Sequence, residues 1–257
     1  MTTIAIANQK GGVGKTTTTV NLAAGLVSLG KRVLCLDFDP QCHLAKYLGH
    51  THDNGATITD FIAAKASYMD MPSTEGLIRH GVAGIDFIPA SLRLSRAETM
   101  LAQAMFRERV LRDILEEIVP EKYDYLLIDC NPSMGVLLTN ALVAADRVLI
   151  PVQTEEFSLD GLEDMVDLIQ MVKKNINPKL EIAGLLPTLT TRTKGSADVI
   201  HWLQDGYPAL VLKTEIGRYA DAPKSVAARK PVIGSKSKLG EQYMAATREL
   251  LARLEEQ

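Results

Sequence analysis

A glycine-rich turn near the amino terminus restricts the possible folds of this chain more than any other feature of its sequence. It lies in "NQKGGVGKTTTTVNLA", residues 8–23, between an apolar run at residues 3–8 and an amphipathic stretch that begins near Lys15. Glycines let a backbone wrap closely around an anion, and a helix that begins there points its first N–H groups at the same place. This order of elements predicts a phosphate-binding loop; a strand-to-helix turn without a ligand is the alternative.

The residues of the turn fit distinct parts of such a loop. Lys15 has the position of the lysine that bridges the β- and γ-phosphates, and Thr16 that of the hydroxyl that ligates Mg²⁺. The strict pattern GxxxxGK[ST] requires a glycine at position 9, where Gln9 stands, so the match is a variant. We expect nucleotide contacts from Lys10, Gly11, Gly12, Val13, Gly14, Lys15, Thr16 and Thr17.

Two further segments place acidic residues at the ends of apolar runs. The stretch "LCLDFDPQ" contains Asp37 and Asp39, and "YLLIDCNP" contains Asp129. An acid at the tip of a buried strand beside a phosphate loop can hold Mg²⁺ or its water shell, although a single aspartate there is often only a helix cap. The combination favours a metal–nucleotide site in which Thr16 lies with aspartates from both segments.

The rest of the chain alternates between β-branched apolar runs and helix-length amphipathic stretches. Runs such as "YLLID" are apolar throughout, which is typical of parallel strands covered on both faces. The alternation predicts one α/β domain over residues 1–257: a doubly wound, mostly parallel sheet flanked by helices, with its ligand site at the carboxyl ends of the strands. We expect strands at residues 3–8, 32–37, 85–89, 125–129, 147–151, 182–187 and 209–214, and helices at 15–29, 57–66, 91–119, 134–145, 158–175, 195–206 and 238–255. Residues 50–82, polar and uneven, are the candidate insertion.

Composition and charge limit the class of protein further. The net charge is −3, yet ten of the 28 Lys and Arg residues and only five of the 31 Asp and Glu residues lie between residues 190 and 248. This asymmetry predicts a nucleic-acid or membrane footprint, with solvated loops and helix faces as the alternative. The three cysteines have no CxxC spacing, which fits a reduced chain. Because we find neither a signal peptide nor an apolar run of roughly 18 residues, we expect a soluble, cytoplasmic protein.

These motifs resemble those of the ParA/Soj-type partition ATPases, which form the deviant Walker A group of P-loop NTPases with MinD and the nitrogenase iron protein. The resemblance rests on "KGGVGKTTTTVNLA", "LDFDPQ", "YDYLLIDCNPS", "NALVAADRVLIPVQTEEFSLDGL" and "RKPV", and runs from Ile4 to about Leu251. It implies ATP and Mg²⁺ as cofactors and a homodimer when ATP is bound. It assigns Lys10 to the partner's ATP, because a second cation beside Lys15 needs additional phosphate charge. A solvated loop cation is the alternative role of Lys10.

The resemblance also implies catalytic roles and exposes three departures. Lys10, Lys15 and Asp39 would be the catalytic residues, with Asp39 positioning the attacking water. The metal-binding residues would be Thr16, Asp39 and Asp129, with Asp129 acting on Mg²⁺ through water. The usual "DPQGN" reads "DPQCH" and "DCPP" reads "DCNP", so the departures are Cys42, His43 and Asn131. His43 could act as a base, but a surface residue at a helix start is the simpler interpretation. Pro187 begins the stretch that we expect to hold the adenine.

In this family a cationic surface late in the chain binds DNA without sequence preference. The corresponding "IGRYADAPKSVAARKPVIGSKSK" keeps an arginine and the "KPV" of the usual "PRNVRLSEAPSYGKPV" but differs between them. Phosphate contacts give salt-sensitive binding, and no helix-turn-helix fingerprint or aromatic stacking pattern indicates base readout. We expect nonspecific double-stranded DNA to contact Arg218, Lys224, Arg229, Lys230, Lys236 and Lys238.

The resulting expectation is a nucleoid-associated, ATP-dependent switch with weak basal hydrolysis that segregates a plasmid or chromosome with a ParB-like adaptor. One alternative uses the same cycle to position a protein organelle, such as a carboxysome, or another complex. A MinD-like membrane regulator would need a basic amphipathic tail, whereas "EQYMAATRELLARLEEQ" ends acidic. An iron–sulfur reductase would need cysteines in ligand motifs that Cys35, Cys42 and Cys130 do not match.

Overall fold

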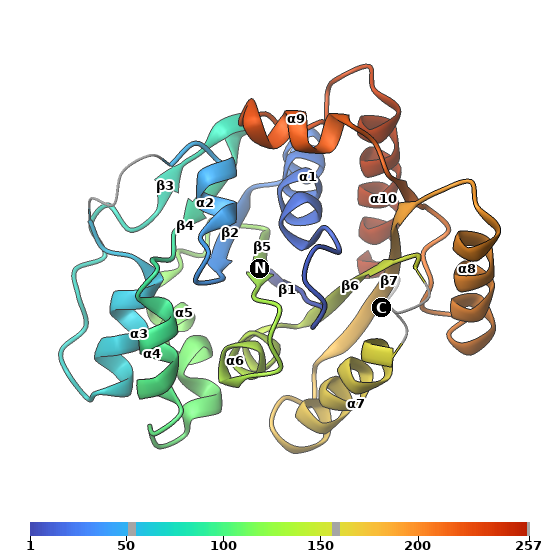
Figure 1. The fold of residues 1–257 in the computed structure, drawn as a ribbon. Coiled ribbons are helices and arrows are strands. Elements are labelled where there is room, and N and C mark those ends of the chain that lie inside the picture. Colours follow the sequence, from blue (N-terminus) through green and yellow to red (C-terminus); the bar gives the residue numbers. More distant parts are fainter. Residues whose placement is uncertain (51–54, 156–159, 256–257) are drawn as a thin grey trace.

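An eight-stranded sheet forms the centre of the molecule in the part of the chain that the computed structural model describes, residues 1–50, 55–155 and 160–255 (Figure 1). The strand order is β3-β4-β2-β5-β1-β6-β7-β8, and all neighbours are parallel except the antiparallel pair β3 and β4. The strands are β1 (Thr2–Ile6), β2 (Val33–Phe38), β3 (Arg79–His80), β4 (Asp86–Ile88), β5 (Tyr125–Cys130), β6 (Arg147–Gln153), β7 (Glu181–Thr190) and β8 (Ile216–Gly217).

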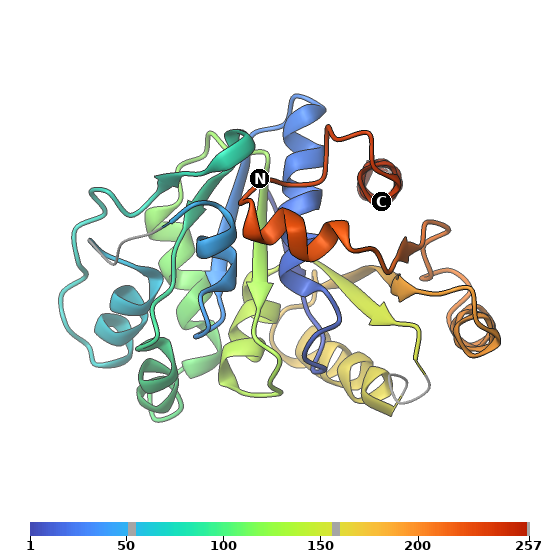
Figure 2. The ribbon, with the colours of Figure 1, turned by 45° about the horizontal axis from the view of Figure 1, so that its top comes forward.

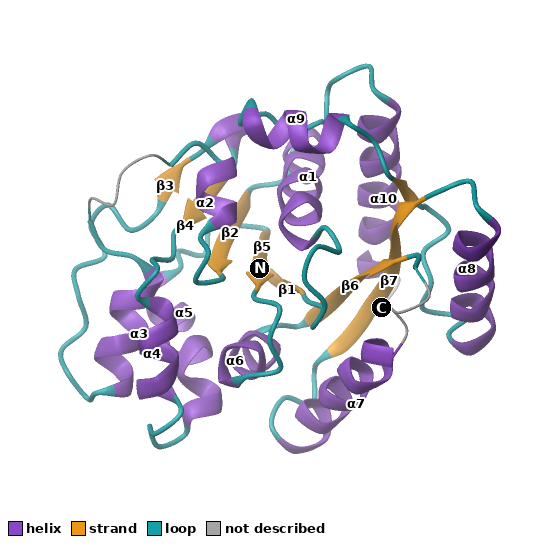
Figure 3. Ribbon diagram, in the orientation of Figure 1, coloured by secondary structure: helices purple, strands orange, loops and turns teal. Residues whose placement is uncertain are grey.

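Helices cover both faces of this sheet (Figure 3). They are α1 (Lys15–Ser28), α2 (His43–Tyr47), α3 (Ile58–Ala66), α4 (Leu94–Leu101), α5 (Val110–Ile118), α6 (Val136–Ala144), α7 (Asp160–Asn175), α8 (Lys194–Gly206), α9 (Asp221–Ala227) and α10 (Lys238–Glu255). Short 3-10 turns lie at Val82–Gly84 and Arg107–Arg109.

Alternation of side chains along each strand separates two hydrophobic cores. Ile4 and Ile6 of β1 pack in the core with α1, α2 and α10, whereas Ala5 packs in the core with α3 to α8. Strands that are apolar on both faces need helices on both faces, which is the physical reason for the doubly wound arrangement. The predicted fold class is confirmed.

The central strand β1 places the glycine-rich turn at the point where the sheet changes its winding direction. The strands that flank it, β5 and β6, are consecutive in the sequence but lie on opposite sides of β1. In open α/β sheets, ligands bind outside the carboxyl end of a strand at such a switch point.

The predicted helix over residues 91–119 is wrong in one respect, because it is two helices, α4 and α5. Asn140 of α6 is fully buried and binds the backbone at the break: its Oδ1 accepts the Leu111 N–H at 2.9 Å, and its Nδ2 donates to the Arg107 carbonyl at 2.7 Å. Phe106 adopts a left-handed φ of 53°, which is incompatible with a continuous helix.

The predicted strand over residues 209–214 is also wrong. This segment forms an isolated bridge between Val211 and Leu185, and the edge strand is β8 instead. The guanidinium of Arg253 donates to the carbonyls of Leu210 at 3.0 Å and Val211 at 2.8 Å. The ladder does not extend beyond this bridge, because Pro187 of β7 has no N–H to donate and the Thr214 N–H is donated to Glu249 Oε2 at 2.9 Å instead.

Residues 50–82, the candidate insertion, include a helix that packs in the hydrophobic core. Residues 51–54 lie outside the described part, but α3 buries Ile58, Phe61 and Ile62 completely in the core. The other predicted helices and strands agree with the structure to within a few residues, whereas α2, α9 and β3 were not predicted; the predicted start of α7 at residues 158–159 lies outside the described part.

Candidate nucleotide site

The loop between β1 and α1 has the backbone shape that a phosphate-binding loop requires. Gly12 and Gly14 have φ of +78° and +90°, values that strain any residue with a Cβ. Helix α1 begins directly after Gly14; in the described structure no side chain caps its amino end, and its first turn holds no acidic residue. The first N–H groups of α1 are therefore oriented toward a site suited to an anion.

The side chain of Lys15 lies across this loop. It is 8% exposed, and its Nζ donates to the carbonyls of Asn8 at 3.0 Å and Lys10 at 2.9 Å. Burial lowers the pKa of Lys15, while the nearby carboxylates Asp129 and Asp39 oppose that shift. The two lysines of the motif thus lie in one loop, and the carbonyl of one accepts the ammonium proton of the other.

Thr16 and Asp129 come together as the metal-site prediction requires. Asp129 ends β5, and its Oδ2 accepts a hydrogen bond from Thr16 Oγ1 at 2.7 Å, while its Oδ1 accepts one from Thr19 Oγ1 at 3.2 Å. Burial raises the pKa of Asp129 to about 7, and the two threonine bonds and Lys15 limit the rise. A buried carboxylate next to a hydroxyl is a donor set that Mg²⁺ or its water shell accepts.

The two aspartates after β2 have different environments. Asp39 is partly buried, and its Oδ1 accepts the Gln41 N–H at 2.9 Å. Asp37 is fully buried; its Oδ2 accepts the Ala45 N–H at 2.9 Å, and burial raises its pKa, with the Asp129 charge adding to the shift. Asp37 therefore holds the loop that carries Asp39.

The phosphate loop is supported by three residues that were not among the predicted site residues. Asn8 donates from Nδ2 to the Pro151 carbonyl at 2.8 Å and accepts the Lys10 N–H at 2.8 Å, so it joins the loop to β6. Thr188 Oγ1 donates to the Val13 carbonyl at 2.9 Å, and Thr19 contacts Asp129 as described. The only sequence signal for them is their position beside a predicted site residue.

The predicted contact Pro187 lies on a strand, and Gln9, which was not a predicted contact, bonds to a helix. Pro187 is buried within β7 and pairs with Val152 of β6, next to the Thr188 that contacts the loop. Gln9, which replaces the motif glycine, donates from Nε2 to Asp164 of α7 at 3.4 Å. A nucleotide contact by Pro187 stays a prediction.

The departures from the family pattern have distinct structural consequences. Cys42 precedes α2 with a left-handed φ of 53°, the conformation that the usual glycine adopts without strain. His43 is exposed at the start of α2, which favours a surface role over a base. Asn131 is buried; its Nδ2 donates to Ser133 at 2.7 Å, and its Oδ1 has no partner among the described residues.

The six predicted DNA-binding residues follow β8 along one segment. Arg218 pairs with Glu155 at 2.7 Å, Lys224 lies on α9, Lys236 precedes α10, and Lys238 is the first residue of α10. Arg229 and Lys230 occupy the turn after α9. Lys224 and Lys230 line a cavity of about 490 Å³ together with Ser235 and Ser237.

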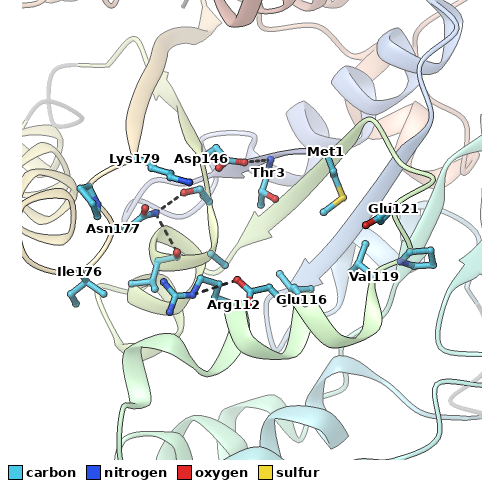
Figure 4. A pocket seen from close by; sticks show the side chains of 16 residues that line it. Met1, Thr3, Arg112, Glu116, Val119, Glu121, Asp146, Ile176, Asn177 and Lys179 are labelled. Carbon is cyan, nitrogen blue, oxygen red and sulfur yellow. Dashed lines mark hydrogen bonds and ion pairs between the residues drawn. The ribbon is translucent and has the colours of Figure 1, made fainter.

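A second cavity, of about 670 Å³, lies at the opposite, amino end of the strands (Figure 4). Several of its polar side chains have partners: Asp146 accepts the Thr3 N–H at 2.8 Å, and Asn177 donates to the Ala145 carbonyl at 2.7 Å. Arg112 and Glu116 lie 3.9 Å apart on α5. This cavity offers no phosphate loop, so the nucleotide site is assigned to the carboxyl end of β1.

Membrane-spanning helices and clusters of metal-ligating side chains are both absent from the described residues. No helix among them is long and apolar enough to cross a membrane. They contain no group of three or more His, Cys, Asp or Glu side chains that could hold a metal ion, and Cys35 and Cys130 are buried in β2 and β5.

Comparison with known proteins agrees with this geometry. A family model described as an AAA domain matches residues 1–182. The sporulation initiation inhibitor protein Soj of Bacillus subtilis is 39% identical over 253 residues, 97% of this chain and 98% of that protein. The chromosome partitioning protein ParA of Myxococcus xanthus is 40% identical over 97% of this chain and 88% of its own.

A solved structure resembles the whole chain. Cobyrinic acid a,c-diamide synthase from Mycobacterium smegmatis, with a bound ATP analogue and magnesium, has a TM-score of 0.85 and 33% identity, covering 99% of this chain and 96% of that one. The site geometry, the family model and the extent of these identities lead to one assignment: the chain belongs to the ParA/Soj family of P-loop partition ATPases.

Proposed function

We propose that this protein is an ATP-dependent dimerising switch that binds nonspecific DNA and hydrolyses ATP to segregate a plasmid or chromosome. The observation that carries the proposal is the loop itself, in which Lys10 and Lys15 lie together beside the Thr16–Asp129 pair. Two cations in one loop repel each other, and phosphate oxygens bound between them would relieve that repulsion. Lys15 would hold the phosphates of its own ATP, and Lys10 those of the partner's.

ATP and Mg²⁺ fit the residues present. The uncapped amino end of α1 suits the phosphates, and Thr16 with Asp129 would hold Mg²⁺ directly or through water. Mg²⁺ would supply charge neutralisation at the β- and γ-phosphates. Asp39, fixed by the Gln41 N–H, would orient the attacking water. Weak basal hydrolysis and stimulation by a ParB-like adaptor are part of the proposal because relatives of this family are partition proteins.

Binding of DNA would use the basic segment after β8. Its six cations lie between Arg218, directly after β8, and Lys238, the first residue of α10, and all lie outside the phosphate loop. Such contacts to phosphate oxygens give affinity without base readout. The protein would then associate with the nucleoid in the cytoplasm.

The alternative cargo, a protein organelle or complex, uses the same residues, and an adaptor gene beside this one would distinguish the two. A MinD-like membrane role has less support, because α10 buries Leu239, Tyr243, Ala246 and Leu250 against the sheet and α1. A helix whose apolar side is already covered has little left to insert into a lipid surface.

The decisive experiment measures affinity for a nonspecific DNA duplex at two salt concentrations, without nucleotide, with ADP and with ATP. The proposal expects binding that requires ATP, weakens steeply with salt and persists in Asp39→Ala, which should bind ATP but not hydrolyse it. Lys15→Ala serves as the control that abolishes ATP binding. DNA binding that is the same in all nucleotide states would contradict the proposal.

A further inference from the structure

Helix α9, which carries Lys224, is attached to the rest of the molecule by very little apolar surface. Of its seven residues, only Ser225 is buried, and Ala222 is a partly buried contact of the core. Lys224 and Val226 point into solvent. Segments with few buried apolar contacts have low local stability and respond readily to changes in their remaining attachments.

The one buried residue of α9 is hydrogen bonded to α2. Tyr47 Oη and Ser225 Oγ lie 2.6 Å apart, and Ser225 Oγ also donates to the Ala222 carbonyl at 2.7 Å. Because a serine hydroxyl has a single proton and a carbonyl can only accept, Tyr47 is the donor to Ser225. The tyrosine is 1% exposed, so water cannot replace this bond without opening the packing.

The second attachment of the basic segment runs to α1. Val232, buried after the turn that holds Lys230, donates its N–H to Asn21 Oδ1 at 2.8 Å, and Asn21 Nδ2 donates to the Thr17 carbonyl at 2.8 Å. Asn21 is fully buried and also interacts with the Tyr47 hydroxyl. Asn21 therefore lies between a residue of the phosphate loop and the basic segment.

Both attachments lead to elements of the nucleotide site. Thr17 follows the predicted Mg²⁺ ligand Thr16 in the first turn of α1. Helix α2 follows the Asp39 loop and is held to β2 by the Asp37–Ala45 bond of 2.9 Å. Figures 1 and 2 both show α9 lying across α1, with α2 beside it.

We propose that Asn21 and Tyr47 are positioning residues that couple the nucleotide state to the placement of residues 219–237 within the basic segment. A shift of α1 or of the Asp39 loop on phosphate binding is transmitted through these two side chains to Val232 and Ser225. It thereby changes where Lys224 and Lys230 lie relative to DNA. This inference rests on the proposed function, and it adds to it the residues through which ATP regulates the DNA-binding surface.

The first test uses Tyr47→Phe and Ser225→Ala, which remove the same bond from either side, and their double variant. Tyr123→Phe is the matched control, since Tyr123 is also buried and donates to Asp86 at 2.7 Å, at the amino end of the sheet. We expect ATP affinity within about twofold of wild type, while the ratio of DNA affinities with ATP and with ADP falls about fivefold. The double variant should lose no more than either single one.

The second measurement does not depend on DNA. Hydrogen exchange of residues 219–237 is followed with and without Mg²⁺ and a non-hydrolysable ATP analogue. The coupling predicts a nucleotide-dependent change in protection in wild type and Tyr123→Phe, reduced by at least half in Tyr47→Phe and Ser225→Ala.

The two measurements separate the two proposals. If wild-type DNA binding ignores ATP, the proposed function fails, yet a nucleotide-dependent change in exchange still supports the coupling. The inference is overturned if nucleotide does not change the hydrogen exchange of residues 219–237 in wild type, or if Tyr47→Phe shows the same change as wild type. Asn21 and Tyr47 are then merely structural.

Discussion

At the scale of single residues, one exposed carboxylate joins two neighbouring strands at the amino edge of the sheet. Asp124 accepts the Arg32 N–H and a guanidinium N–H, each at 2.8 Å, just before β5 and β2 begin. These bonds from Arg32 lower the pKa of Asp124 to about 2. A carboxyl whose pKa is lowered by folding stabilises the protein above its unfolded pKa of 3.8, and this contribution is lost as the pH falls through about 2.

Asp124→Asn should therefore lower the free energy of unfolding at pH 6, and its difference from wild type should shrink between pH 4 and pH 2. Urea unfolding at a series of pH values measures this difference. Because the pair is exposed, 1 M salt should narrow the gap at pH 6. Asp70→Asn, at another exposed position, is the control. An Asp124→Asn gap of equal size at pH 6 and pH 2 would show that the ion pair contributes nothing.

The residues of the nucleotide site differ in whether a short stretch of sequence is enough to identify them. Lys15, Thr16 and Asp129 could be predicted because a loop motif and an acid at a strand end are visible in the sequence alone. Asn8, Thr19 and Thr188 could not, because their partners lie 143, 110 and 175 positions away in the chain. Such contacts exist only after the sheet has assembled.

At the scale of elements, the packing of α1 on α10 depends on one glycine. A Cβ built at Gly25 would lie 2.3 Å from Thr247 Oγ1 and 2.9 Å from its Cγ2. Thr247 is fully buried, and its Oγ1 donates to the Tyr243 carbonyl at 2.7 Å, so it cannot rotate away without losing that bond. The two helices therefore approach closely at this point.

Gly25→Ala should destabilise the protein by about 1–3 kcal/mol, because the helices must separate to admit the methyl group. Gly195→Ala on α8 is the matched control: that glycine is exposed, with no neighbouring atom within 4 Å of the added Cβ, and alanine there should leave stability unchanged or raise it by up to about 1 kcal/mol. Chemical unfolding of wild type and both variants measures these differences in the free energy of unfolding. Equal stability of Gly25→Ala and wild type would mean that α10 moves at no cost.

Element boundaries were predictable where hydrophobic periodicity decides them and not where a distant side chain does. The strands β1, β2, β5 and β6 follow their apolar runs closely. The break between α4 and α5 depends on Asn140, and the Thr214 N–H that a strand at residues 209–214 would use is bound by Glu249. Neither contact leaves a signal in the local sequence, since both residues belong to other helices.

At the scale of the whole molecule, positive charge is concentrated where the proposed DNA surface lies. Lys224 and Lys230 line one cavity of the basic segment, whereas Lys122 and Lys179 lie before β5 and β7, at the amino end of the sheet. The sequence predicts the charge asymmetry, but only the fold shows that these two lysine pairs lie in different parts of the molecule. Binding through phosphate contacts should distinguish them.

Lys224→Ala/Lys230→Ala should weaken DNA binding and make it less sensitive to salt. Each lysine that contacts a phosphate contributes about 0.9 to the slope of log affinity against log salt, so the double variant should lose about 2 per protomer. Lys122→Ala/Lys179→Ala removes the same net charge and should leave the slope unchanged. Titrations of a nonspecific duplex at four salt concentrations with ATP measure both slopes. Equal losses in the two variants would indicate that net charge alone attracts DNA, and the basic segment would then have no special role, because a localised surface must lose more from its own lysines than from distant ones.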